Sequence, residues 1–357
     1  MSRRAARRFN ARAACGRVLV RRARPLMGTL VGVAVRGDAP DAAERAIRNV
    51  FAEMERLESI LSEWRPDSAV SQVNRSAGEA PVRVPRDLIE VLQVAAGVSH
   101  ASAGAFDSTW AALSGMWRFH DPDFRPPSAD AVESVRRLVD YRDVVLDVRA
   151  RTLFLKRRGM RLGLGGIAKA YIAERAADLA VASGVNHILI DAGGDVVARG
   201  RRGERPWSAG VRHPRAASCL LATVDLGDEV LATSGDYEHF VDMDGHRYHH
   251  LLDPRTGSPA SASQSATVIA ANGALAEALS TALFVLGPPG LEILSTFAQT
   301  AALLVDGNGV AHFTASGNAR FHRVAVDRDV AGSPRPRRSR TGAGSATVEI
   351  ASYPSTV

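Results

Sequence analysis

The segment SGDYEHFVDMDGHRYHHLLDPRTG, residues 234–257, places two adjacent histidines, His249 and His250, just before a DPRTG turn. Its alternation predicts a hairpin with strands at 238–242 and 246–252, joined by an acidic glycine turn. Neighbouring residues on a strand face opposite sides, so one histidine can enter a pocket while the other faces solvent or a structural partner. An imidazole with an ordinary pKa of about 6.5 can take a proton from a hydroxyl at neutral pH. The segment is therefore either the carrier of a catalytic base or a polar hairpin with surface histidines.

A glycine-rich turn, LGLGGIAKAY at 162–171, lies between a predicted strand and a predicted helix. Gly163, Gly165 and Gly166 would let the backbone approach a phosphate or a metal closely, and the N-terminus of the new helix favours an anion. Lys169 adds a positive charge in the first turn of that helix. Because the pattern is neither GxGxxG nor a Walker loop, a tight packing turn is an equal alternative.

Three side-chain oxygens occur close together in AEALSTALF, residues 276–284. Glu277 and Thr281 are four residues apart, so both lie on one face of a helix, with Ser280 alongside. Oxygen ligands of this kind suit Mg²⁺, which prefers octahedral geometry and retains waters or substrate phosphates. An ordinary solvated helix edge is the alternative interpretation.

Two further residues are candidates for contact with a ligand. In GAFDSTW, residues 104–110, Asp107 follows an apolar pair and precedes a predicted helix, as an N-cap does. Trp64 lies at the end of a predicted helix in LSEWRPDSAVSQVN. Such a residue usually packs in a core, although a planar ligand could stack on it.

Strands and helices of several kinds must position these residues. The long helix within 39–64 has one apolar face, formed by Ala43, Ile47, Val50, Met54, Leu57 and Leu61. The other predicted helices lie at 86–102, from the glycine turn to about 183, at 273–287, and after 287. Predicted strands lie at 26–37, 143–147, 152–156, 187–200, 207–213, 219–226, 230–243, 266–271 and in 301–326. Residues 121–133, with three prolines, look like an insertion or a lid.

The excess positive charge of the chain lies in its termini. The 357 residues carry 45 Lys and Arg against 38 Asp and Glu, a formal net charge of +7. Residues 1–24 hold nine arginines and no acidic residue, whereas residues 25–326 hold 31 basic and 35 acidic groups. We therefore expect a folded domain at 25–326, a disordered Arg-rich segment at 1–24 and a disordered basic tail at 327–357. A nucleic-acid partner is not expected.

The sequence contains few signs of disulfides, metal clusters or membrane segments. Cys15 and Cys219 lie in unlike settings, so neither a disulfide framework nor a zinc cluster is predicted. No stretch approaches the roughly 20 apolar residues of a membrane span. The N-terminus has an arginine pair and an AAC sequence, but Arg12 and Arg17 lie where a signal peptide has its apolar region. The sequence favours a cytoplasmic protein, with export to the periplasm or association with the inner membrane as the alternative.

Taken in order, the motifs of the chain resemble those of the ApbE family, the FAD:protein FMN transferases. The resemblance spans about residues 26–325 and rests on MGT, LSEWRPDSAVSQVN, GAFDSTW, LGGIAKAY, DAGGD, SGDYEHF, HHLLDPRTG and AEALSTALFVLG. It implies an α+β fold, described as T-fold-like, with mixed sheets and packed helices in a single catalytic unit. It also implies Mg²⁺-dependent transfer of FMN from FAD to a Thr or Ser hydroxyl of an acceptor protein, with release of AMP.

The resemblance implies roles for individual residues. His250, the second histidine of the pair, would be the catalytic base and would contact FAD. The metal would be held by the backbone carbonyl of Gly166, by Glu277 and by Thr281, with Ser280 as a further candidate. The other residues that would line the FAD site are Met27, Trp64, Ala105, Phe106, Asp107 and Lys169.

Three positions depart from the family pattern. Glu277 replaces the usual Asp, and its longer side chain requires a shifted metal site or an intervening water. Gly163 replaces an acidic residue, which removes a contact with FAD, and Ala170 replaces the usual Gly. These departures leave two alternatives to the transferase: a FAD pyrophosphatase that releases FMN and AMP, and a flavin-binding protein without turnover.

Overall fold

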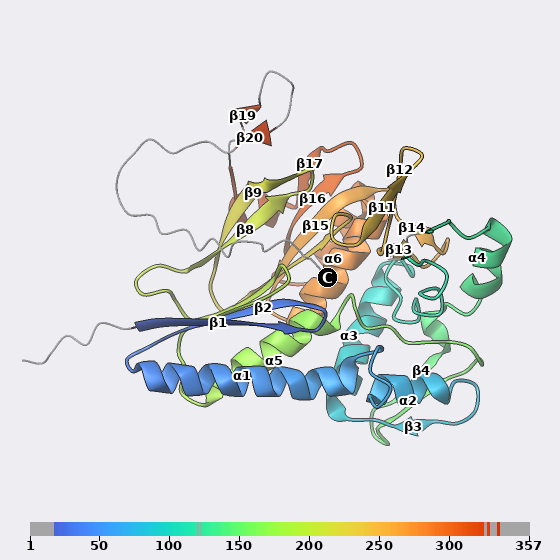
Figure 1. The fold of residues 1–357 in the computed structure, drawn as a ribbon, viewed down its shortest axis with the longest axis horizontal. Helices are drawn as coiled ribbons and strands as arrows, with labels where there is room; N and C mark the ends of the chain where they lie inside the picture. The colour runs from blue at the N-terminus through green and yellow to red at the C-terminus, as the bar shows by residue number, and fades with distance from the viewer. Residues whose placement is uncertain (1–17, 120, 122, 325–326, 329–333, 336–357) are drawn as a thin grey trace, which may run out of the picture.

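An eight-stranded sheet runs through the centre of the computed structural model, which describes residues 18–119, 121, 123–324, 327–328 and 334–335 (Figure 1). Each strand pairs with its neighbours in antiparallel register. In spatial order its strands are β1 (Val18–Leu26), β2 (Thr29–Gly37), β6 (Ile188–Ala192), β7 (Asp195–Arg199), β10 (Val230–Gly235), β15 (Ser263–Ala270), β16 (Ala301–Asp306) and β17 (Ala311–Phe313).

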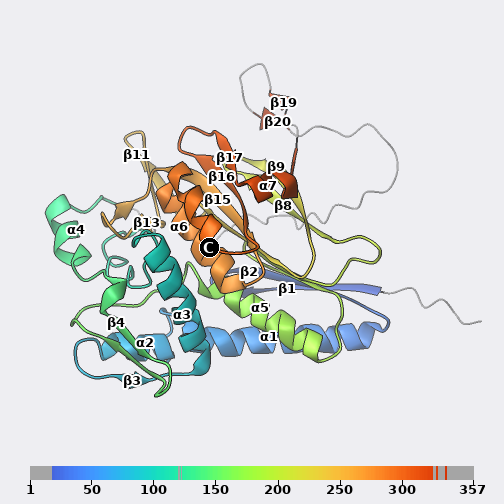
Figure 2. The same cartoon turned by 180° about the vertical axis from the view of Figure 1, so that it is seen from behind.

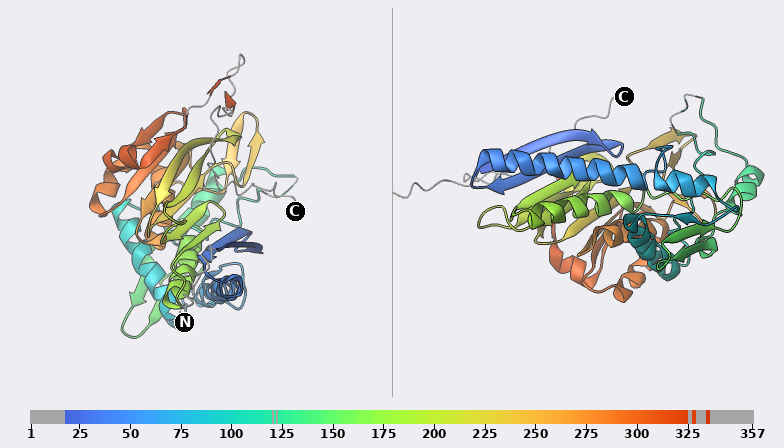
Figure 3. Two further views of the ribbon diagram at one scale, coloured as in Figure 1. Left: turned by 90° about the vertical axis from the view of Figure 1, so that its left-hand side faces the viewer. Right: turned by 90° about the horizontal axis from the view of Figure 1, so that it is seen from below.

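Helices cover one face of this sheet, as Figure 3 shows from the side and from below. The period of two along each strand explains the burial: Ile188 and Ile190 of β6 pack under the helices, whereas Leu189 packs on the opposite face. The amphipathic face predicted for the first helix is confirmed, because all six of its apolar residues are buried. The covering helices are α1 (Pro40–Leu61), α3 (Arg86–Ala101), α5 (Ala168–Ala182) and α6 (Gly273–Leu286).

A second, three-stranded sheet covers the other face. It consists of β8 (Trp207–His213), β9 (Ala216–Leu226) and β18 (Phe321–Arg323), in the order β18, β9, β8. Trp207 is fully buried between the two sheets, and its Nε1 donates to the Arg199 carbonyl at 3.1 Å. The short helix α7 (Ala315–Arg320) precedes β18.

Smaller elements lie beyond one edge of the helical layer (Figure 2). The hairpin predicted around the two histidines is present as β11 (Phe240–Met243) and β12 (His246–His249), which pair only with each other. The other small elements are α2 (Ala69–Arg75), α4 (Ala129–Arg136), β3 (Val82–Arg83), β4 (Val144–Asp147), β5 (Thr152–Leu155), β13 (Leu252–Asp253), β14 (Ser258–Pro259), and the 3₁₀ helices η1 (Tyr141–Asp143) and η2 (Pro288–Thr296).

The α+β fold class is confirmed, and several predicted boundaries are corrected. The single strand predicted at 187–200 is two strands, because Gly193 and Gly194 take positive φ and turn the chain. The strand predicted at 230–243 ends at Gly235 before the hairpin begins. The second helix after 287 is the 3₁₀ helix η2 rather than an α-helix. Within the region suggested as a lid, residues 129–133 belong to α4.

The N-terminal boundary also differs from the expectation. Residues 18–24, assigned from their arginines to a disordered segment, form most of β1 and pair with β2 from Val18 to Leu26. Backbone pairing does not depend on side-chain charge, and the arginines lie along an exposed edge strand. Residues 1–17 lie outside the described residues, as does the tail at 327–357 apart from the paired strands β19 (Asp327–Arg328) and β20 (Pro334–Arg335). Within the part of the chain that the structure describes, no helix could cross a membrane.

Candidate active site

Lys169 lies at the centre of a buried polar cluster in the first turn of α5. Its Nζ donates to Asp195 Oδ2 at 2.6 Å and to Glu277 Oε1 at 2.8 Å. Burial by itself would lower the pKa of Lys169, but the two carboxylates outweigh this effect and raise it. The amine is therefore charged, and two carboxylates share one ammonium. Such a cluster retains the capacity to attract a further cation.

Glu277 links helices α5 and α6, which cross closely. At Gly273 a Cβ would lie 2.5 Å from the Ala170 carbonyl oxygen, so only glycine allows this approach. Glu277 Oε2 then accepts the N–H of Ala170 at 2.9 Å. That N–H belongs to the first turn of α5, where no partner exists within the helix. Burial raises the pKa of Glu277, opposed by the charge of Lys169.

A row of hydroxyl groups extends from this cluster toward the glycine turn. A Cβ on Gly166 would lie 3.0 Å from Thr281 Oγ1, so α6 packs directly against the turn. Thr281 Oγ1 lies 3.2 Å from Ser234 Oγ, which lies 2.9 Å from Ser280 Oγ. Ser280 is fully buried and also donates to the Glu277 carbonyl at 2.9 Å. Of the oxygen groups predicted as metal ligands, the hydroxyl of Ser280 has the least free capacity.

The donor chemistry of these residues fits Mg²⁺. The side chains are hydroxyls and a carboxylate, and the backbone of Gly166 packs against Thr281, so every donor that these residues could offer is an oxygen. A carboxylate has about four acceptor positions, and Glu277 uses two of them, for Lys169 and Ala170. No group of three His, Cys, Asp or Glu side chains suited to a metal occurs among the described residues. A cation here would therefore depend on the Gly166 carbonyl and the Thr281 hydroxyl as well as on Glu277.

His250 follows the last residue of β12. Its backbone N–H donates to the His239 carbonyl at 3.1 Å, and its Nδ1 lies 3.4 Å from the same oxygen. The ring also meets the His239 ring edge-on, with centroids 5.4 Å apart. Burial, assisted by His239, His249 and Lys169, lowers the pKa of His250 to about 3. The imidazole is therefore neutral at neutral pH and, with Nδ1 toward the carbonyl, can accept a proton at Nε2.

His249 has a different environment, as strand alternation predicts. It is buried, and its Nε2 donates to the Ala260 carbonyl at 2.8 Å while Nδ1 accepts from the Leu251 N–H at 3.3 Å. The ring meets Phe284 of α6 at a right angle, with centroids 5.5 Å apart. Burial lowers the pKa of His249. The interpretation of both histidines as surface residues is therefore wrong, and His249 is part of the packing between the hairpin and α6.

The structure shows a packing role for the first part of the glycine turn. Gly163 is a packing residue: a Cβ there would lie 2.8 Å from Trp110 Nε1 and 2.7 Å from the Ala111 Cβ. Trp110 Nε1 donates to the Gly163 carbonyl at 3.0 Å, and the Gly163 N–H donates to Ser108. The indole of Trp110 thus leaves no room for a side chain at position 163. Gly166, three residues later, faces Thr281 and the polar cluster.

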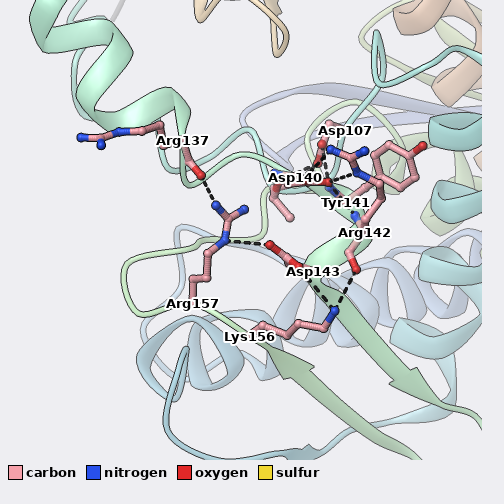
Figure 4. A network of polar contacts seen from close by, with 9 residues as sticks. Asp107, Arg137, Asp140, Tyr141, Arg142, Asp143, Lys156 and Arg157 are labelled. Atoms are coloured by element: carbon pink, nitrogen blue, oxygen red, sulfur yellow. Dashed lines mark hydrogen bonds and ion pairs between the residues drawn. The ribbon is translucent and has the colours of Figure 1, made fainter.

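Asp107 holds two turns together rather than capping a helix. Its Oδ1 accepts from the N–H and the hydroxyl of Thr109, at 2.7 and 2.6 Å, and its Oδ2 accepts from the Tyr141 N–H at 2.8 Å. The helix predicted after it is absent, since residues 107–119 form successive turns. Figure 4 shows Asp107 next to Tyr141, beside the ion pair of Asp140 with Arg142. Burial raises the pKa of Asp107, and its hydrogen bonds oppose the increase.

Ala105 and Phe106 lie in the loop after α3 and are both buried. A Cβ on Gly166 would lie 3.6 Å from Phe106 Cε2, so the aromatic ring borders the glycine turn. The fold therefore brings Phe106 next to Gly166, although the two residues are far apart in the sequence.

Met27 and Trp64 lie at the end of β1 and at the end of α1. Met27 takes a left-handed conformation in the turn between β1 and β2, and its N–H donates to Glu58 Oε1 at 2.9 Å. Trp64 follows α1 and is 73% exposed, which excludes the usual core role. A Cβ on Gly165 would lie 3.6 Å from Oε1 of Glu63, so the residue before Trp64 lies beside the glycine turn.

Two residues of the site received no role from the sequence. Asp195 begins β7 directly after the Gly193–Gly194 turn and holds Lys169, while Ser234 near the end of β10 joins Thr281 to Ser280. Both lie in quoted motifs, DAGGD and SGDYEHF. The sequence could have indicated Asp195, because it is an acidic residue at the start of a strand that must be buried, and a buried carboxylate needs a partner.

The fold and the site define an α+β protein in which an oxygen-rich, lysine-centred cluster lies near a neutral imidazole. The sequence profile of the ApbE family matches residues 27–304. The FAD:protein FMN transferase of Treponema pallidum is 35% identical over 292 residues, which cover 76% of this chain and 81% of that protein. The same-named protein of Klebsiella pneumoniae is 34% identical over 246 residues, 68% of this chain and 76% of its own.

Solved structures agree with these relatives. The ApbE protein of Thermotoga maritima has a TM-score of 0.78 at 30% identity, with 86% of this chain and 100% of that chain covered. The apo form of the Pseudomonas stutzeri flavinyl transferase ApbE has a TM-score of 0.76 at 30% identity, with 87% and 98% covered. The chain belongs to the ApbE family.

Proposed function

We propose that this protein transfers FMN from FAD to a Thr or Ser hydroxyl of an acceptor protein, with Mg²⁺, and releases AMP. Flavin transfer is the activity class of the family, and the protein is an enzyme of that class. The observation that carries the finer proposal is the placement of Gly166, Glu277 and Thr281 together beside Lys169. Glu277 and Thr281 come from α6 and Gly166 from the glycine turn, and their donors are those that Mg²⁺ prefers.

The proposed reaction breaks one phosphoanhydride bond and forms one phosphoester. His250 Nε2 accepts the proton of the acceptor hydroxyl, whose oxygen forms a bond to the FMN phosphorus. The bond from that phosphorus to the bridging oxygen breaks, and the electron pair leaves with AMP. Mg²⁺, held by the Gly166 carbonyl, Glu277 and Thr281, would offset the charge that accumulates on the phosphates. The side chains of Trp64 and Phe106 would position the flavin and the adenine-linked diphosphate, together with Met27, Ala105, Asp107 and Lys169.

Two observations bear on the alternatives from the sequence. A base for an acceptor hydroxyl must be unprotonated, and burial lowers the pKa of His250, so its imidazole is neutral at neutral pH. The changes that suggested lost function also have structural compensation: Trp110 fills the space at Gly163, and Glu277 spans the distance to Lys169 and Ala170. A FAD pyrophosphatase would use the same groups with water in place of the acceptor hydroxyl, so it is an outcome of the test.

The test is incubation of the protein with FAD and Mg²⁺, with a Thr-containing acceptor protein, with the same acceptor bearing Val in place of that Thr, and with no acceptor. In-gel flavin fluorescence detects the modified acceptor, and chromatography detects FMN and AMP. We expect one AMP per flavin attached, a fluorescent band only with the Thr acceptor, and no reaction in EDTA. Free FMN with AMP in all three arms would identify a pyrophosphatase, and unchanged FAD would identify a binding protein.

A further inference from the structure

Trp117 contacts the chain on both sides of His250. Its ring stacks on that of Tyr248, two residues before the histidine, with centroids 6.2 Å apart and planes at 26°. Its Nε1 donates to the Gly257 carbonyl at 2.9 Å, in the DPRTG turn that follows the histidine. Trp117 is 7% exposed. One indole therefore fixes the strand that leads to His250 and the turn that leads away from it.

Side-chain contacts hold the hairpin in place, and the packing of His249 on Phe284 and Ala260 is one of them. Its strands β11 and β12 form a sheet of their own, so no hydrogen-bonded ladder ties them to the eight-stranded sheet. An isolated two-stranded hairpin is marginal in water and needs packing against other elements. Besides His249, that packing comes from a cluster of apolar residues that we call the aromatic cluster. Its members are Leu113, Trp117, Phe124, Val132 and Leu252, with Trp110, Phe119 and Tyr248 packed against them.

The aromatic cluster also reaches the glycine turn. Trp110 belongs to it and donates to the Gly163 carbonyl, three residues before the proposed metal ligand Gly166. At the other end, a Cβ on Gly257 would lie 2.6 Å from Val132 Cγ1, so the DPRTG turn is seated closely on α4. The same cluster thus contacts the two segments whose relative position decides the distance from the base to the diphosphate.

We propose that Trp117 is a positioning residue for the transfer reaction, which sets the location of His250 through Tyr248 and Gly257. The contacts of Trp117 are with Tyr248 and Gly257 rather than with the acceptor hydroxyl or the phosphate, so its effect on the reaction passes through the position of His250. The inference rests on the proposed function, because it assigns to Trp117 the geometry of that reaction. A displacement of a catalytic group by about 1 Å can cost on the order of 10²-fold in rate.

The chain offers a matched control for the test. Trp207 is also buried, and its Nε1 also donates to a backbone carbonyl, that of Arg199, but it lies between the two sheets. Trp117→Phe and Trp207→Phe each remove one indole hydrogen bond from a packed site. We expect Trp117→Phe to lower kcat for transfer on the order of 10- to 100-fold with the Kd for FAD changed less than about threefold. Trp207→Phe should lower thermal stability and leave kcat near the wild-type value.

A double-mutant cycle separates positioning from general loosening. If Trp117 acts through the base, Trp117→Phe should have no further effect on the residual rate of His250→Ala. Equal losses from Trp117→Phe in both backgrounds, or equal kcat losses in Trp117→Phe and Trp207→Phe, would overturn the proposal. A wild-type kcat in Trp117→Phe would do the same. A wild-type protein that modifies no acceptor would instead refute the proposed function, so the two failures are distinguishable.

Discussion

The two histidines of the hairpin should separate stability from catalysis. His249→Ala removes a buried imidazole whose Nε2 donates to the Ala260 carbonyl at 2.8 Å and whose ring packs on Phe284. A buried carbonyl left without its donor costs about 1–3 kcal/mol, and loss of an aromatic pair costs about 0.5–1.5 kcal/mol. The expected decrease in the free energy of unfolding is about 2–4 kcal/mol. For a domain of about 300 residues this lowers Tm by roughly 3–6 °C.

His250→Ala should have the opposite profile. This ring is only partly buried, and its loss removes the proposed base, so we expect transfer to fall by roughly 10² to 10⁴ with FAD still bound and Tm little changed. Strand alternation predicted that only one of the two histidines would enter the site, which agrees with a catalytic role for His250 and a structural role for His249. The sequence did not indicate that His249 contributes to stability.

The assay measures thermal unfolding by circular dichroism and acceptor flavinylation at a temperature where every variant is folded. FAD affinity is measured separately by tryptophan quenching. His249→Phe is the control, because it keeps a ring against Phe284 but loses the hydrogen bond, and it should lose about 1–3 kcal/mol. The reasoning fails if His249→Ala is as inactive per folded molecule as His250→Ala, or if His249→Ala unfolds at the wild-type Tm.

Three further outcomes follow from the geometry. Glu277→Asp introduces the residue usual in the family but should weaken activity, because the shorter side chain withdraws from both Lys169 and Ala170. A titration of activity against Mg²⁺ would show this loss, and an unchanged or improved variant would contradict it. Deletion of residues 1–17 should leave cooperative thermal unfolding intact, whereas deletion of residues 1–24 removes most of β1 and should lower Tm. The same Tm in both deletion variants would show that β1 does not contribute to stability. Burial lowers the pKa of His250 to about 3, so its neutral, proton-accepting form persists as the pH falls and is lost only near that value. The decrease of kcat/KM on the acid side that is due to His250 should therefore lie well below pH 6.5. A decrease near pH 6.5 that disappears in His250→Ala would contradict this.

The local sequence pattern was sufficient to predict the main helices and strands and to single out most of the candidate site residues. The apolar face of α1, the hairpin around the histidines and the helix that holds Glu277 and Thr281 were all predictable, because each depends on a period of two or 3.6 within a short stretch. The ordered motifs were also sufficient to indicate the family, which the profile match and the relatives establish. Boundaries were less predictable where backbone geometry decides them, as at the Gly193–Gly194 turn and in the arginine-rich strand β1.

Tertiary structure decided which groups became partners. The sequence placed Lys169, Asp195 and Glu277 in three separate elements, and only the close crossing of α5 and α6 at Gly273 brings the amine between the two carboxylates. Nothing local distinguishes Trp117 as a residue that bridges both flanks of His250. Hydrophobic periodicity reports which face of an element is buried, whereas the partner of a buried polar group depends on the packing of elements distant in the chain. That packing is a property of the whole fold, because each contact is made only when the others are in place.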